Sequence, residues 1–103
     1  MTHTANPARG EAGFVVDGET IVLRPSFEAL VAAEEELGPL FALVERAAAG
    51  GLRLGEMAAL FWHCARAPRP ARERIGAAIA EGGLARATPA LKLLLMQILQ
   101  GRG

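Results

Sequence analysis

Tyrosine is absent from this sequence of 103 residues, and cysteine and tryptophan each occur once. A single cysteine, Cys64, excludes an internal disulfide and suits a reducing compartment. No apolar run reaches the roughly 20 residues that a membrane-spanning helix needs, so we expect no membrane span. The first residues, Met1 to Gly10, lack the apolar segment of a signal peptide and include Pro7.

Groups that carry enzyme chemistry are also scarce. Asp17 is the only aspartate, and the two histidines, His3 and His63, lie far apart in the chain. His63 is the chain neighbour of Cys64, so on a helix it points about 100° away and is poorly placed as its base. A zinc site needs three or four ligands at recurrent spacing, which this chain lacks. We therefore expect no enzyme activity, no metal and no cofactor.

The composition predicts one small domain that is rich in helix. Hydrophobic residues make up 51% of the chain, and many of them are alanine, which favours helices. A chain of this length forms a single modest core. We expect a frayed tail over residues 1–10 and one domain over residues 11–103.

Opposite charges gather in the two halves of the sequence. Residues 1–50 hold three Arg and eight Asp or Glu, a net charge of −5, whereas residues 51–103 hold eight Lys or Arg and three Glu, a net charge of +5. Such halves favour head-to-tail self-association or attraction of a partner, or they are two ordinary solvated surfaces. The run Glu34-Glu35-Glu36 is interpreted as a solvated acidic face.

Arginines in the second half raise the question of nucleic-acid binding, because guanidinium groups can contact phosphates. Only Trp62 is nearby to stack on a base, and the net charge is zero, unlike a typical basic binding domain. The sequence therefore disfavours nucleic acid as a partner. The arginines in question are Arg66, Arg69, Arg72, Arg74 and Arg86.

Residues 14–23 predict a β-hairpin, because Asp17-Gly18 between alternating apolar runs is typical of a type I′ turn. A two-residue turn pairs Val16 with Glu19 and Phe14 with Ile21. One face then gathers Phe14, Val16, Ile21 and Leu23, and the other shows Val15, Thr20 and Val22. An isolated hairpin is marginal in water, so a helix should cover the first face. Both outer edges are expected to stay open to another chain.

Helices are predicted for the rest of the chain. Pro25 ends the second strand, Ser26 is a good N-cap, and the first helix should span residues 27–37, with Phe27, Leu30 and Val31 facing the hairpin. Glycine and proline pairs then divide the chain. The later helices are expected to begin at Pro39, at Gly55 or Glu56, after Pro70 and at Thr88-Pro89. The fold class is α+β, mostly α, with an N-terminal β-hairpin and about five short helices.

Some apolar residues lie off the predicted core stripes. Leu93 and Met96 project away from the main apolar side of the fifth helix, and Trp62 lies roughly 140° from Met57 on the third. Either a second helix buries these groups or they face a partner. The candidate partner-binding residues are Trp62, Leu93 and Met96, together with Val15 and Val22 of the hairpin.

Two segments of the chain resemble a known family. The resemblance is to a small-protein family of gene transfer agents. It is carried by Gly10-Glu11, the Asp17-Gly18 hairpin and residues 23–30, and by residues 52–59 with Trp62. Related proteins occur in tailed phages and prophages of alphaproteobacteria. The family is generally regarded as tail assembly chaperones and has also been called a tail tube protein. The proline-rich, basic segment 67–72 departs from the pattern.

The resemblance implies a protein without enzymatic activity. Tail assembly chaperones bind the tape-measure protein, a long helical chain with apolar faces, while tube subunits assemble around it. The resemblance thus implies a cytoplasmic, self-associating chaperone that is absent from the mature particle, with the hairpin edge and the fifth helix as interaction surfaces. The alternative is a structural subunit of the tail tube.

Overall fold

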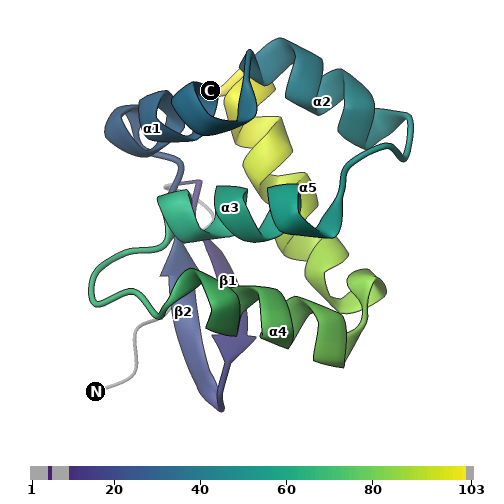
Figure 1. The fold of residues 1–103 in the computed structure, drawn as a ribbon. Helices are drawn as coiled ribbons and strands as arrows, with labels where there is room; N and C mark the ends of the chain where they lie inside the picture. Colours follow the sequence, from purple (N-terminus) through teal and green to yellow (C-terminus); the bar gives the residue numbers. More distant parts are fainter. Residues whose placement is uncertain (1–4, 6–9, 102–103) are drawn as a thin grey trace.

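The computed structural model describes residue 5 and residues 10–101, and it contains a β-hairpin followed by five helices, as the sequence predicts (Figure 1). Most of the predicted tail, residues 1–4 and 6–9, lies outside the described residues. None of the described helices is long and apolar enough to cross a membrane. The elements are β1 (Ala12–Val16), β2 (Glu19–Leu23), α1 (Phe27–Leu37), α2 (Leu40–Ala48), α3 (Leu54–Cys64), α4 (Arg72–Gly82) and α5 (Leu84–Gln100).

The hairpin has the predicted register. Val16 pairs with Glu19 and Phe14 with Ile21 in an antiparallel ladder. Asp17 and Gly18 adopt φ angles of 52° and 81°, as a type I′ turn requires of both central residues. Phe14, Val16 and Leu23 are buried on the inner face, as expected, whereas Val15 is 56% exposed on the outer one.

The outer edge of β2 is not open, which corrects the prediction for this side of the hairpin. The Arg24 backbone N–H donates to the Cys64 carbonyl at 2.7 Å, and the Arg66 N–H donates to the Val22 carbonyl at 2.9 Å. Leu23 and Ala65 form an antiparallel bridge. Val22, predicted on the exposed face, is only 4% exposed. The chain that leaves α3 therefore occupies the edge that another strand would need.

Helix α1 has the predicted bounds but a different inner face. The Ser26 hydroxyl accepts from the Ala29 N–H at 3.2 Å, which is the predicted N-cap. Phe27 is 83% exposed and Val31 is 39% exposed, so the expectation that they cover the hairpin is wrong. Ala33 is the buried residue of α1, and the helix packs on α3 instead. Its small inner residue permits a close approach between the two helices.

The middle helices follow the glycine and proline signals within one or two residues. Pro39 is the N-cap of α2 rather than its first residue, and α3 begins at Leu54, just before the predicted start. Apolar residues at helical spacing form a stripe along α3, and this α3 stripe is buried as a whole. It consists of Met57, Leu60, Phe61 and Cys64.

Helix α5 begins five residues earlier than predicted, with Gly83 in place of Thr88 as its N-cap. Gly83, with φ of 88°, separates it from α4, and the helix then continues through Pro89. Proline removes one intrahelical hydrogen bond. The Thr88 hydroxyl donates to the Leu84 carbonyl at 2.9 Å, so the Thr-Pro pair lies inside the first turns rather than capping them.

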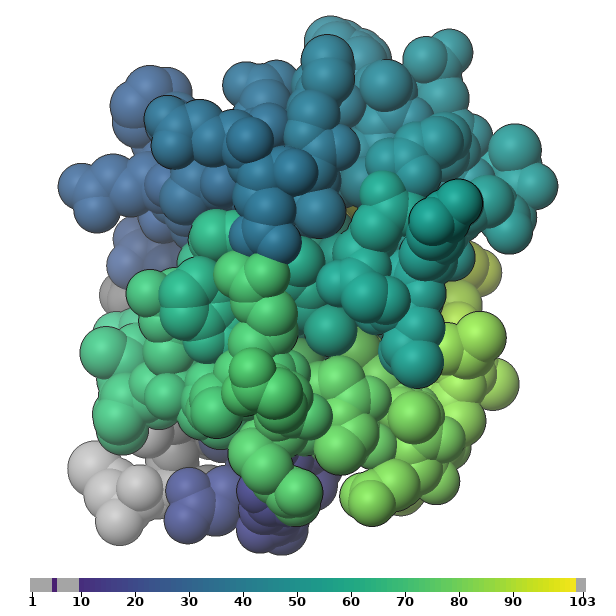
Figure 2. All heavy atoms as spheres, in the orientation of Figure 1, coloured from purple at the N-terminus to yellow at the C-terminus, as the bar shows by residue number. Residues whose placement is uncertain are grey.

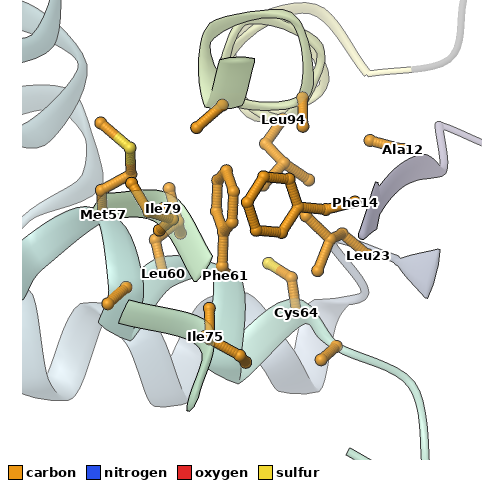
Figure 3. Packing of buried hydrophobic residues seen from close by; sticks show 14 of the residues in the cluster. Ala12, Phe14, Leu23, Met57, Leu60, Phe61, Cys64, Ile75, Ile79 and Leu94 are labelled. Atoms are coloured by element: carbon orange, nitrogen blue, oxygen red, sulfur yellow. The ribbon is translucent and has the colours of Figure 1, made fainter. Parts of the chain in front are cut away.

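The core lies where α3, α4 and α5 meet the inner face of the hairpin. The rings of Phe14 and Phe61 meet edge to face with centroids 5.2 Å apart. Figure 3 shows Leu94 of α5 pointing at this pair and Ile75 of α4 lying beside α3. Helices α3, α4 and α5 thus supply the cover that the hairpin needs, in place of α1.

The remaining helices form an upper layer. In Figures 1 and 2, α1 and α2 lie on the side of α3 away from α4 and the hairpin. Helix α5 passes behind α3, and its C-terminal end reaches α1 and α2 (Figure 1). This arrangement brings the ends of α1 and α5 beside the start of α2.

Candidate partner-binding surfaces

Trp62 is covered by two arginines of the proline-rich segment. The guanidinium carbon of Arg69 lies 3.8 Å from the ring centroid, and that of Arg72 lies 4.6 Å from it. Arg69 also donates to the Trp62 carbonyl at 3.1 Å. Cation–π contacts of this kind fix both partners. The half-buried ring is therefore held within the chain, and this answers the question that its off-stripe position raised.

The two candidate residues of α5 differ in exposure. Met96 is 52% exposed, as predicted, but Leu93 is half-buried and packs against the core. Leu99 follows Leu91 and Leu95 at helical spacing, which predicts the core side, but it is 50% exposed. The inner face of α5 centres on Ala87, Ala90 and Leu94. The core side of α5 therefore includes the alanines near its start as well as Leu94, and it is not simply the leucine-rich stripe.

The five predicted partner-binding residues do not form one surface. Val15, Val22 and Trp62 line three different hollows of the molecule. Val22 is buried beside the chain that crosses β2, so it offers no surface to a partner. Met96 and Val15 are the candidates that the structure leaves most exposed.

Acidic residues from the first half of the sequence form ion pairs with basic residues from the second half. Arg72 donates to both carboxylate oxygens of Glu36, at 2.5 and 2.9 Å, and His63 Nε2 lies 2.7 Å from Glu36 Oε1. These contacts lower the pKa of Glu36, with the Arg72 hydrogen bond as the main cause. Arg74 pairs with Asp17, which lowers the pKa of that carboxyl.

Arg66 of the cluster and Glu34 of the acidic run also have partners within the chain. Arg66 lies 3.6 Å from a carboxylate oxygen of the buried Glu11. Glu34 accepts from the Leu40 backbone N–H at 3.1 Å and so caps α2. The predicted solvated acidic face is confirmed, since Glu34, Glu35 and Glu36 are all exposed. Glu34 and Glu36 also have hydrogen-bond partners within the chain, which the sequence did not predict.

The structure reveals an apolar groove that sequence reasoning missed. It measures about 230 Å³ and lies between the end of α1, the start of α2 and the end of α5. Phe41, one of its walls, is 75% exposed. The sequence signal was its position directly after Leu40 and off the helical spacing of Leu40, Leu43 and Ala47. The groove is lined by Glu34, Pro39, Leu40, Phe41, Ile98 and Leu99.

Candidate catalytic groups do not converge in the part of the chain that the structure describes. No cluster of three or more His, Cys, Asp or Glu side chains suited to a metal occurs among those residues. Cys64 is 2% exposed, and burial raises the pKa of its thiol to about 12. It packs as a small apolar residue, as its place on the α3 stripe predicts.

Comparison with known proteins adds a family to this geometry. Neither a curated protein nor a solved structure matches the chain. One protein family, described as "Phage tail tube protein, GTA-gp10", matches residues 9–101. That match spans both strands and all five helices. The chain therefore belongs to this family of phage tail and gene transfer agent proteins.

Proposed function

We propose that this protein is a tail assembly chaperone, without enzymatic activity, that binds the tape-measure protein while the tail tube forms. The observation that carries the proposal is an exposed apolar surface on α1, α2 and the second half of α5, in a chain of a phage-tail family. Among the described residues, eight large apolar side chains are exposed, and five of them lie on α1, α2 and the second half of α5. They are Phe27, Val31, Phe41, Met96 and Leu99.

Such a surface suits a helical client. A helix with an apolar face aggregates in water unless that face is covered, and an exposed groove between helices can cover it. The unbranched side chain of Met96 has three rotatable bonds, which lets it adapt to different partners. The protein would act in the cytoplasm of a bacterial host, self-associate, and leave before the particle is mature.

A structural subunit of the tail tube is the second candidate, because the family description names the tail tube. A tube built by strand addition needs free sheet edges. The described sheet has two strands, and the chain from α3 crosses the β2 edge. That leaves β1 as the only described strand with an edge for such pairing, which favours the chaperone.

Co-expression with the tape-measure protein of the same tail module separates these candidates. Affinity purification of the tagged chain should recover a soluble complex, and an unrelated long coiled coil of similar length serves as the control client. Mass spectrometry of purified particles should find the tape measure but not this protein. Rings or tubes formed by the protein alone, together with its presence in particles, would establish the structural subunit instead.

A further inference from the structure

The groove at the ends of α1 and α5 has an electrostatic character of its own. Of the six residues that line it, Glu34 is the only charged one. Neither α1 nor α5 has a basic residue in its last turn. The C-terminal end of a helix carries a partial negative charge, equivalent to roughly half an electron, on its free carbonyl groups. Two such ends therefore meet at the groove, and among the described residues neither brings a cation in its last turn. The start of α2, which carries the opposite partial charge, also lies there, and Glu34 faces it through the Leu40 N–H.

Acidic side chains extend this negative region. Glu45 is exposed on α2 one turn after Phe41, and Glu35 follows Glu34 on α1. Glu34, Glu35 and Glu45 form no salt bridge with any described residue. Glu34 uses one carboxylate oxygen to accept from the Leu40 backbone N–H. The rim of the groove is therefore acidic while its walls are apolar.

An apolar stripe on α1 leads into the groove. Phe27, Val31 and Glu34 stand at positions i, i+4 and i+7, which lie on one face of a helix. Phe27 and Val31 are 83% and 39% exposed, and Glu34 lines the groove. The stripe spans about 10 Å along the helix axis. A ligand that follows it needs regularly spaced apolar groups, as an amphipathic helix has.

We propose that the α1 stripe and the groove bind a basic amphipathic helix, whose apolar residues contact Phe27, Val31, Phe41 and Leu99 and whose lysines or arginines meet the acidic rim. This inference rests on the proposed function for its client, the tape-measure protein. It adds the chemistry of the bound segment, which must be apolar on one face and positively charged along that face's border. A helix with an acidic border would be repelled.

Two synthetic peptides of about 18 residues test the chemistry, since this length spans the stripe and groove as a helix. They share one leucine stripe, and one carries lysine and the other glutamate at the polar positions. In fluorescence anisotropy, the lysine peptide should bind the protein about tenfold or more tightly than the glutamate peptide, and less tightly as salt rises. Equal binding of both peptides, or of neither, would overturn the proposal.

Neutral substitutions locate the site. The variant Phe41→Ser/Leu99→Ser should weaken binding of the lysine peptide by about tenfold. Leu54→Ser/Leu84→Ser is the matched control, because these leucines are 42% and 56% exposed outside the groove. It should bind as the unmodified protein does. Circular dichroism establishes that both variants fold, and equal losses in both would remove the groove as the site.

Charge substitutions test the rim separately from the walls. A triple Glu→Gln variant in the rim should weaken lysine-peptide binding and flatten its salt dependence, while an equal triple change elsewhere should do so much less. Similar losses in both would make the effect one of net charge and contradict the proposal. The rim variant changes Glu34, Glu35 and Glu45, and the control changes Glu19, Glu73 and Glu81.

Failure of the function and failure of the site give different results. If the tape-measure protein co-purifies equally well with Phe41→Ser/Leu99→Ser, the client is right and the groove is wrong. If it does not co-purify even with the unmodified protein, while the lysine peptide binds and depends on the groove, the site stands and the client is another protein. A stable dimer that Phe41→Ser/Leu99→Ser dissociates would assign the groove to a second copy and overturn the proposal.

Discussion

Glu56 shows how a single surface residue joins two helices. Its carboxylate accepts from Arg46 of α2 at 2.8 and 2.7 Å and from the Arg53 backbone N–H at 3.0 Å, at the start of α3. These hydrogen bonds, with the Arg46 pair as the main cause, lower the pKa of Glu56 from 4.5 to about 2. A lowered pKa in the folded state means that protonation favours unfolding.

The change of protein stability with pH should reflect the ionisation of Glu56. The contribution of Glu56 is fully present above its unfolded pKa of 4.5 and is lost as the pH falls toward about 2. In Glu56→Gln, which cannot titrate, the melting temperature should be lower at neutral pH and should fall less steeply over that range. Glu73→Gln on α4 is the control. Identical slopes for Glu56→Gln and the unmodified protein would show that the Arg46 contact contributes nothing in solution.

The burial of Cys64 leads to a second prediction about a single residue. Its thiol is buried, and its pKa of about 12 leaves almost no reactive thiolate at neutral pH. Reaction with an aromatic disulfide reagent should therefore be slow in the folded protein and rapid in denaturant. Rapid reaction of the folded chain at pH 8, at the rate of a free thiol, would contradict this burial.

Two glycines have different effects on stability, because one lies in a turn that requires a positive φ and the other lies in a helix. Gly18 has φ of 81° in the hairpin turn, whereas Gly55 lies inside α3 without a positive φ, and neither has atoms within 4 Å of an added Cβ. Gly18→Ala should destabilise the fold by about 1 kcal/mol, and Gly55→Ala should stabilise it by about 0.5 kcal/mol. Urea denaturation measures both. Equal effects would mean that the turn tolerates a side chain at this φ.

Local signals predicted most elements because each depends on a few neighbouring residues. The Asp17-Gly18 turn set the hairpin register, and Ser26 with Gly38 set the bounds of α1. The start of α5 was missed because Thr88-Pro89 has the composition of a cap, yet lies inside the helix. Phe27 was misplaced since periodicity shows that a helix has an apolar side but not which neighbour buries it.

Contacts between distant residues could not be predicted in the same way. Arg72 reaches Glu36 across 36 positions, and Arg74 reaches Asp17 across 57. Nothing in the local sequence selects these pairs, because they depend on how α1, α3 and α4 stack. The groove has the same origin, since Phe41 and Leu99 come together only when α5 returns to the upper layer. The partner-binding residues were therefore harder to predict from the sequence than the helices and strands.

Charge distribution over the whole molecule bears on nucleic acid as a partner. The sequence suggested that the arginine-rich segment could bind phosphates, but three of its arginines have partners inside the chain. Arg69 and Arg72 lie on Trp62, and Arg74 pairs with Asp17. An arginine that already contacts a carboxylate must break that contact before it can hold a phosphate. With zero net charge, the molecule should then have little affinity for DNA.

A variant that releases the arginines tests this argument directly. The unmodified protein should not retard double-stranded DNA at low salt. Asp17→Asn/Glu36→Gln raises the net charge by two and removes the carboxylate partners of Arg72 and Arg74, so it should bind DNA weakly and lose this binding as salt rises. Glu19→Gln/Glu73→Gln raises the net charge equally but frees no arginine, since neither glutamate pairs with one among the described residues. Equal binding by both variants would attribute the effect to net charge, and binding by the unmodified protein would mean that the internal pairs do not occupy these arginines.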